Sequence, residues 1–186
     1  FHSIKSCNCT LFWSVFVTAS AELSLAIHHW GSEEQKEKYL PKMAAGEYLG
    51  CFGLTEPDAG SDPASMKMRA TRDGDEWVIN GQKTFITNGI MSDLVIVVCK
   101  TDADAGAHGF SLIVVERDTP GFERGRNLEK IGMSAQDTAE LSFTDVRVPA
   151  SNLLGEEGKG FRYILSGMNA ERLLIAAECI GDAKWF

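Results

Sequence analysis

The chain has 186 residues, 44% of them hydrophobic and 24% charged, a balance typical of a globular protein with a buried core. A formal net charge of -8 argues against a nucleic-acid partner or an anionic membrane surface, although local dipoles can still hold an anionic ligand. The five cysteines are scattered and odd in number, so no disulfide framework is expected and a reducing compartment is favoured.

The first residues carry an apolar run, residues 11–21, that ends at Glu22. The run is too short to cross a bilayer, so no transmembrane segment is expected. Two interpretations stay open: a secretory signal, because residues 19–21 are similar to a signal-peptidase site, or a buried helix that enters from upstream sequence. We prefer the second, since the sequence begins with Phe1. Cys7 and Cys9 lack a second pair at zinc spacing, so no zinc site is expected there.

A capping box predicts the start of the next helix, because Ser32 and Gln35 can each accept a hydrogen bond from the other's backbone N–H. We expect this helix to end near Pro41 or at Gly46. Residues 1–48 are therefore predicted to be helical.

From about Met66 the sequence changes to short runs typical of strands. Asp73-Gly74 and Asn80-Gly81 are both signals for two-residue hairpin turns, with a strand over residues 76–79 between them. Three further strands are predicted, at Leu94–Cys99, Phe110–Val115 and Leu141–Val148. Residues 49–150 are therefore predicted to form an antiparallel β sandwich or small barrel.

A glycine-rich linker at residues 155–160 leads from the strands into a second helical segment, and the two together belong to a region predicted at residues 151–186. Asn169 is the predicted N-cap of the helix that follows. That helix is apolar on nearly every face, which is typical of a helix inside a bundle. Since the sequence ends while the helix is still running, we expect a chain truncated at its C-terminus. The predicted fold class is α+β with an incomplete helical bundle.

Four segments, in one order and spacing, resemble the acyl-CoA dehydrogenase family of flavoproteins. They are GLTEPDAGSD at Gly53–Asp62, NGQKTFITNG at Asn80–Gly89, GFERGRNLEKIGMSAQDTAEL at Gly121–Leu141 and FTDVRVPASNLLGEEGKGF at Phe143–Phe161. The resemblance covers residues 30–186, is strongest to the long-chain branch, and leaves residues 1–20 poorly matched. It implies the end of an N-terminal helical domain (1–48), a whole central β domain (49–150) and the start of a C-terminal four-helix bundle (151–186).

The family resemblance also implies an activity: FAD-dependent α,β-dehydrogenation of a fatty acyl-CoA to the trans-2-enoyl-CoA, with electrons passed to an electron-transfer flavoprotein. A homo-oligomer, dimer or tetramer, is expected at full length, in the mitochondrial matrix of a eukaryote or the cytoplasm of a bacterium. Two alternatives stay open: an acyl-CoA oxidase or flavin monooxygenase on the same fold, and an inactive truncated paralogue that acts as an interaction protein. The 186-residue chain alone is expected to be inactive.

The resemblance places two segments against the flavin ring, and their residues are Phe52, Leu54, Thr55, Phe85, Ile86 and Thr87. It implies that Thr55 donates its hydroxyl to the polar edge of the ring and that Thr87 lies near N5. Phe85 stands where many relatives carry Trp, and without the resemblance an aromatic in the sheet core would be preferred for it. Since Phe85 and Thr87 alternate along one strand, both are expected on the same face.

The predicted catalytic base is Glu171, because the long-chain and isovaleryl branches carry their base in a Glu-Arg-Leu triplet that residues 171–173 match. A Glu in the first turn of a helix has another explanation, since the helix dipole favours a negative charge there by about 0.3–1 kcal/mol. Against that explanation, a buried acid in an otherwise apolar helix is costly. Desolvation by substrate would also raise its pKa toward neutrality, which suits a base.

Seven further residues are implied to contact the acyl-CoA substrate: Ser61, Ala107, His108, Arg162, Asn169, Ala170 and Arg172. A solvated loop histidine is an equal alternative for His108, and Arg162 departs from the Tyr of the long-chain branch. Asp58 and Asp62 lack the third acid and closing Glu of a calcium loop, so no metal site is expected. The segment Asp137-Thr138 is expected to fix strand packing.

Overall fold

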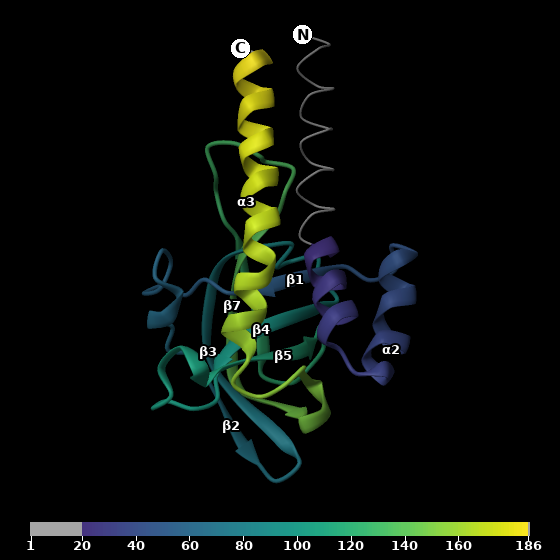
Figure 1. Cartoon of the computed structure of the whole chain (residues 1–186), viewed down its shortest axis with the longest axis vertical. Coiled ribbons are helices and arrows are strands. Elements are labelled where there is room, and N and C mark those ends of the chain that lie inside the picture. The colour runs from purple at the N-terminus through teal and green to yellow at the C-terminus, as the bar shows by residue number, and fades with distance from the viewer. Residues whose placement is uncertain (1–19, 186) are drawn as a thin grey trace.

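The computed structural model describes residues 20–185 (Figure 1). The proposed signal segment and the pair Cys7 and Cys9 thus lie outside the described residues, apart from the last two positions of the apolar run. A helix whose described part is residues 20–30 precedes α2 (Glu33–Ala44). The strands are β1 (Gly50–Gly53), β2 (Arg69–Asp73), β3 (Glu76–Thr87), β4 (Leu94–Lys100), β5 (Phe110–Glu116), β6 (Phe122–Asn127), β7 (Thr138–Pro149) and β8 (Leu153–Leu154). Helix α3 (Gly160–Trp185) follows them, and short 3-10 turns are η1 (Pro63–Ser65), η2 (Gly106–Gly109) and η3 (Ala150–Asn152).

The α+β class is confirmed, and the sheet that forms its centre is mixed. Its strands follow the order β6-β7-β3-β2-β4-β5-β8, and β1 pairs with β4 beside this path. Most neighbours are antiparallel, as predicted, but β1 and β2 each run parallel to β4. Parallel neighbours need a long connection. The chain supplies it by building β2 and β3 between β1 and β4. The domain boundaries at residues 48 and 150 stay predictions.

The predicted capping box of α2 is confirmed. The Gln35 N–H donates to Ser32 Oγ at 3.2 Å, and the Ser32 N–H donates to Gln35 Oε1 at 3.0 Å. The helix passes through Pro41 and ends at Ala44, between the two ends considered. The Gln35 amide also donates to the carbonyls of Ser151 and Leu153, at 2.9 and 3.1 Å, which fastens α2 to the end of the β region.

Of the two predicted hairpin turns, one is confirmed and one is wrong. Asp73 pairs with Glu76 around a turn that contains Gly74 at a φ of +60°. Asn80 and Gly81 instead lie inside β3, where the register with β7 shifts. Gly81 has a φ of +145°, and a Cβ there would lie 2.7 Å from the Met68 side chain. The glycine thus serves a β-bulge under a close side chain, not a turn.

Helix α3 corrects the prediction that Asn169 is an N-cap, because the helix runs unbroken through that residue. Its start is fixed at Gly160, where a Cβ would lie 2.9 Å from the Phe110 carbonyl oxygen of β5. The Tyr163 ring then stacks on Trp30 of the first helix, with centroids 4.2 Å apart and planes at 18°. These contacts at the first turn outweigh the weak capping signal further along.

The second half of α3 extends beyond the sheet (Figure 1). Its apolar side chains are exposed, among them Leu173 at 74%, Ile175 at 58% and Trp185 at 69%. Among the described residues, no helix combines the length and apolar character that a membrane span requires.

The core lies on both faces of the sheet, and β4 shows this by its alternation. Val95, Val97 and Cys99 belong to one apolar cluster, and Leu94, Ile96 and Val98 belong to the other. The second cluster also contains buried side chains of the three helices that the structure describes: Leu23, Ile27, Tyr39, Met43 and Ile164. The helices therefore cover one face of the sheet and leave a crevice where α3 leaves it.

Candidate active site

Two cavities lie between the first helix, the ends of β1 and β3, and α3. The smaller has a volume of about 260 Å³ and the larger about 500 Å³. Both are lined by Glu22, Phe52, Leu54 and Glu171. Because these four side chains are shared, the cavities are two parts of one space, which we call the crevice.

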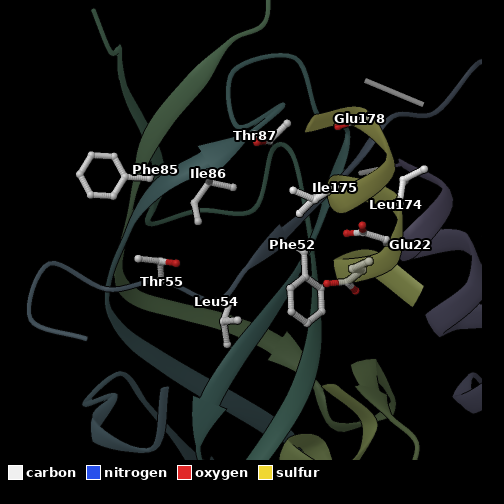
Figure 2. A pocket seen from close by; sticks show the side chains of 11 residues that line it. Glu22, Phe52, Leu54, Thr55, Phe85, Ile86, Thr87, Leu174, Ile175 and Glu178 are labelled. Atoms are coloured by element: carbon white, nitrogen blue, oxygen red, sulfur yellow. The ribbon is translucent and has the colours of Figure 1, made fainter. Parts of the chain in front are cut away.

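The smaller cavity brings together seven of the residues predicted from sequence (Figure 2). They come from the end of β1 and the loop after it, from the end of β3, and from α3: Phe52, Leu54, Thr55, Phe85, Ile86, Thr87 and Glu171. The loop after β1 and the end of β3 meet here because the Thr84 N–H donates to the Thr55 carbonyl at 2.9 Å. The wall is apolar, with threonine hydroxyls at Thr55 and Thr87.

The end of β3 does not keep the simple alternation expected for Phe85 and Thr87. The register with β7 shifts between Lys83 and Ile86, and Phe85 adopts a φ of +57° with 67% of its surface exposed. Figure 2 shows Phe85 and Thr87 leaving the strand in different directions. The Thr87 hydroxyl accepts a hydrogen bond from the Gln136 amide at 3.0 Å. A non-glycine residue held at positive φ is costly, and such residues cluster at active sites and ligand-binding segments.

A buried ion pair holds the loop that follows β1. Lys83 is fully buried, and its Nζ lies 2.9 Å from Glu56 Oε1 and 2.9 Å from the Leu54 carbonyl oxygen, to which it donates. The Glu56 carboxylate accepts the N–H groups of Lys67 and Met68 at 2.6 and 3.0 Å. Burial lowers the pKa of Lys83, and the charge of Glu56 opposes that shift. The pair thus holds the backbone groups of Leu54, Lys67 and Met68 beside the crevice.

The remaining acids of the GLTEPDAGSD segment have structural partners. Asp58 forms an exposed pair with Lys67 at 3.1 Å. Asp62 accepts the N–H of Ala64 at 3.1 Å and caps η1. The segment is therefore a fastened loop in which each carboxylate has a different task.

The turn after Thr87 is fastened in a similar way. The Asp137 carboxylate accepts the backbone N–H groups of Ile90 and Met91. The Asn88 N–H donates to the Asp137 carbonyl at 3.3 Å. These bonds accord with the structural role expected for residues 137–138.

Glu171 lies eleven residues after Gly160, about three turns into α3. The helix dipole acts within the first turn, so it does not account for a carboxylate at this position. Burial raises the pKa of Glu171 above its ordinary value. Burial also raises the pKa of Glu22 to about 7, and the charge of Glu171 adds to that shift. Two carboxyls with raised pKa values thus face an apolar wall.

Of the residues predicted to contact substrate, Ala170 lines the larger cavity. The others line neither cavity: Ser61, Ala107, His108, Arg162, Asn169 and Arg172. The carbonyl of His108 packs against the linker before α3, since a Cβ at Gly158 would lie 2.6 Å from it. Contact of these six residues with a substrate stays a prediction.

Sequence reasoning missed several residues of the site. Glu22 and the aromatic pair Trp30 and Tyr163 line the larger cavity, and Gln136 holds Thr87 from a distant loop. One signal was available for Glu22, because it is the charged residue at which the apolar run 11–21 ends. No local pattern indicates the others.

The helices on one face of a mixed sheet, and the crevice that holds Glu22 and Glu171, match the fold of solved dehydrogenases that use a flavin. Two family profiles match the chain: "Acyl-CoA dehydrogenase, middle domain" over residues 51–146 and "Acyl-CoA dehydrogenase, N-terminal domain" over residues 4–47. The chain belongs to the acyl-CoA dehydrogenase family. The second match begins at residue 4, so the resemblance extends into residues 1–20, where it had not been expected.

Three relatives show how broad the match is. The chain is 54% identical to the mitochondrial long-chain specific acyl-CoA dehydrogenase of Sus scrofa, over 86% of this chain and 37% of that protein. It is 42% identical to butyryl-CoA dehydrogenase from Megasphaera elsdenii, with a TM-score of 0.87 over 91% of this chain and 45% of that one. A structure described as an FAD-dependent dehydrogenase matches at 31% identity and a TM-score of 0.81, over 84% and 42%. The chain spans less than half the length of these relatives.

Proposed function

We propose that the protein catalyses the FAD-dependent α,β-dehydrogenation of a fatty acyl-CoA to the trans-2-enoyl-CoA. The observation that carries this proposal is the position of Glu171, which lines both parts of the crevice opposite the wall of Phe52, Leu54 and Thr87. Family membership and the activities for which the relatives are named support the same reaction. They include long-chain and butyryl-CoA enzymes, so the acyl-chain length is left open.

The smaller cavity fits a flavin ring by the chemistry of its lining. Phe52, Leu54 and Ile86 offer apolar surface to the flat faces of the ring, and Thr55 and Thr87 offer hydroxyls to its polar edge. When bound, FAD supplies the acceptor for the hydrogen that leaves Cβ with its electron pair. We place the acyl thioester in the larger cavity, against Trp30, Ile164 and Met168.

Within this arrangement Glu171 takes the proton from Cα, while the Cα–Cβ double bond forms as both C–H bonds break. The carboxylate must be ionised to accept the proton, and a raised pKa makes it a stronger base near neutrality. The apolar wall keeps water away from the reacting carbons, which strengthens electrostatic interactions inside the crevice.

We further propose that an electron-transfer flavoprotein receives the electrons, that the full-length protein is a homo-oligomer, and that it works in the mitochondrial matrix of a eukaryote or the cytoplasm of a bacterium. The family resemblance supports these points, and the matrix location is supported by a mitochondrial relative.

The test is anaerobic bleaching of the oxidised flavin by an acyl-CoA in the purified full-length protein. We expect bleaching together with one equivalent of enoyl-CoA per flavin. Hydrogen peroxide release in air at the rate of turnover would instead indicate an oxidase. Stoichiometric flavin that no acyl-CoA bleaches would favour the inactive paralogue.

A further inference from the structure

The crevice holds a second carboxyl, Glu22, that the reaction as described does not use. Glu22 projects from the first helix, whereas Glu171 projects from α3, and both side chains line both cavities. Figure 2 shows Glu22 beside the turn of α3 that carries Leu174. Two helices that are far apart in sequence thus place one carboxyl each at the point where the cavities meet.

The surroundings of this pair supply little positive charge. The first helix adds His29 to the larger cavity, and α3 adds Tyr163 there and Glu178 to the smaller cavity. The sheet adds only apolar and hydroxyl side chains. No lysine or arginine appears among the described residues that line the crevice. Two carboxylates without a counter-ion repel each other in a partly desolvated site, so one of them tends to keep a proton.

We propose that Glu22 and Glu171 form a carboxyl pair that holds one proton in common, and that Glu22 is a positioning residue that sets the proton affinity of Glu171. Its role in catalysis rests on the proposed function, whereas the pair itself does not. The raised pKa of Glu22, to which the charge of Glu171 contributes, accords with this coupling. Interacting carboxyls lose their protons in two steps that belong to the pair.

The charge state of Glu22 affects the proton affinity of Glu171. When Glu22 is ionised, its charge increases the affinity of Glu171 for the proton that leaves Cα. Glu22→Gln keeps this position uncharged at every pH, so the ionisation near pH 7 and its effect on Glu171 should be lost. Glu171→Gln should let Glu22 ionise at lower pH, although burial still holds its pKa above the ordinary value.

The pair is tested directly by infrared difference spectra of the carboxyl groups in the full-length protein without substrate, recorded across the pH range on both sides of 7. The wild type should show a carboxyl titration near pH 7, which Glu171→Gln should move to lower pH and Glu22→Gln should abolish. Glu37→Gln, an exposed site on α2, should leave the titration unchanged. If Glu171→Gln does not move the Glu22 titration, the pair does not exist, whatever the enzyme catalyses.

The catalytic role has its own readout in the pH dependence of flavin bleaching. In the wild type the rate should rise as Glu22 ionises near pH 7, because the new charge makes Glu171 a stronger base. Glu22→Gln should lose this rise, whereas a residue with a purely structural role would scale the rate at every pH and leave the rise in place. A rise that persists in Glu22→Gln would therefore overturn the positioning role, even if the infrared titrations confirm the pair.

Discussion

Glu171→Gln in the full-length protein is expected to slow acyl-CoA-driven flavin bleaching by about 10²–10⁴-fold, the usual effect of removing a general base. The amide keeps the shape of the side chain but cannot take the Cα proton. Flavin content should stay near that of the wild type, because the predicted ring contacts are made by Phe52, Thr55 and Thr87. Stopped-flow absorbance under anaerobic conditions measures both quantities in one sample.

A matched control lies on the same helix. Asp182→Asn also removes one carboxylate from α3, at an exposed position that lines neither cavity. It should bleach at close to the wild-type rate. If Glu171→Gln bleaches as fast as Asp182→Asn with equal flavin content, the base lies elsewhere in the full-length protein.

Lys83→Met should lower the free energy of unfolding by about 3–5 kcal/mol, the usual cost of leaving one member of a buried ion pair without its partner. Lys83 is fully buried and Glu56 is 6% exposed, so water cannot replace the lost contact. The loop that carries Leu54 and Thr55 also loses a hydrogen bond, since Lys83 donates to the Leu54 carbonyl. Urea denaturation followed by circular dichroism provides the measurement.

The chain offers an exposed comparison for this pair. Lys67→Met removes the pairing with Asp58 on the same loop, where both side chains are mostly solvent-exposed, and should change the stability by less than about 1 kcal/mol. Adding Glu56→Gln to Lys83→Met should restore part of the loss, because no charge is then left buried. Equal effects of the Lys67 and Lys83 variants would show that the buried pair is not needed.

Local sequence signals predicted the elements that a capping residue or an apolar run indicates. The capping box at Ser32 and the apolar runs at β4 and β5 correspond to observed elements. The signals at Asn80-Gly81 and Asn169 failed because tertiary contacts decided those positions. Gly81 lies under Met68, and α3 is already fixed at Gly160. Neither contact can be inferred from neighbouring residues.

The residues of the site also divide into those that local motifs predict and those that only long-range packing brings there. The resemblance places residues of contiguous motifs together, such as Thr55 and Thr87, and the structure brings them to one cavity. Glu22 and Gln136 reach the site through long-range packing and were missed. The placement of Glu171 three turns into α3 also changes its interpretation, because only the structure removes the helix dipole as an explanation.

The central claim is that the crevice places a flavin opposite Glu171 with the thioester between them. A crystal structure of the full-length protein with FAD and a non-reactive acyl-CoA analogue tests it most directly. We expect a Glu171 carboxylate oxygen within about 3–3.5 Å of Cα, on the side away from the flavin ring, as a reacting pair requires. A Glu171 side chain that faces bulk water, with the analogue bound elsewhere, would contradict the claim.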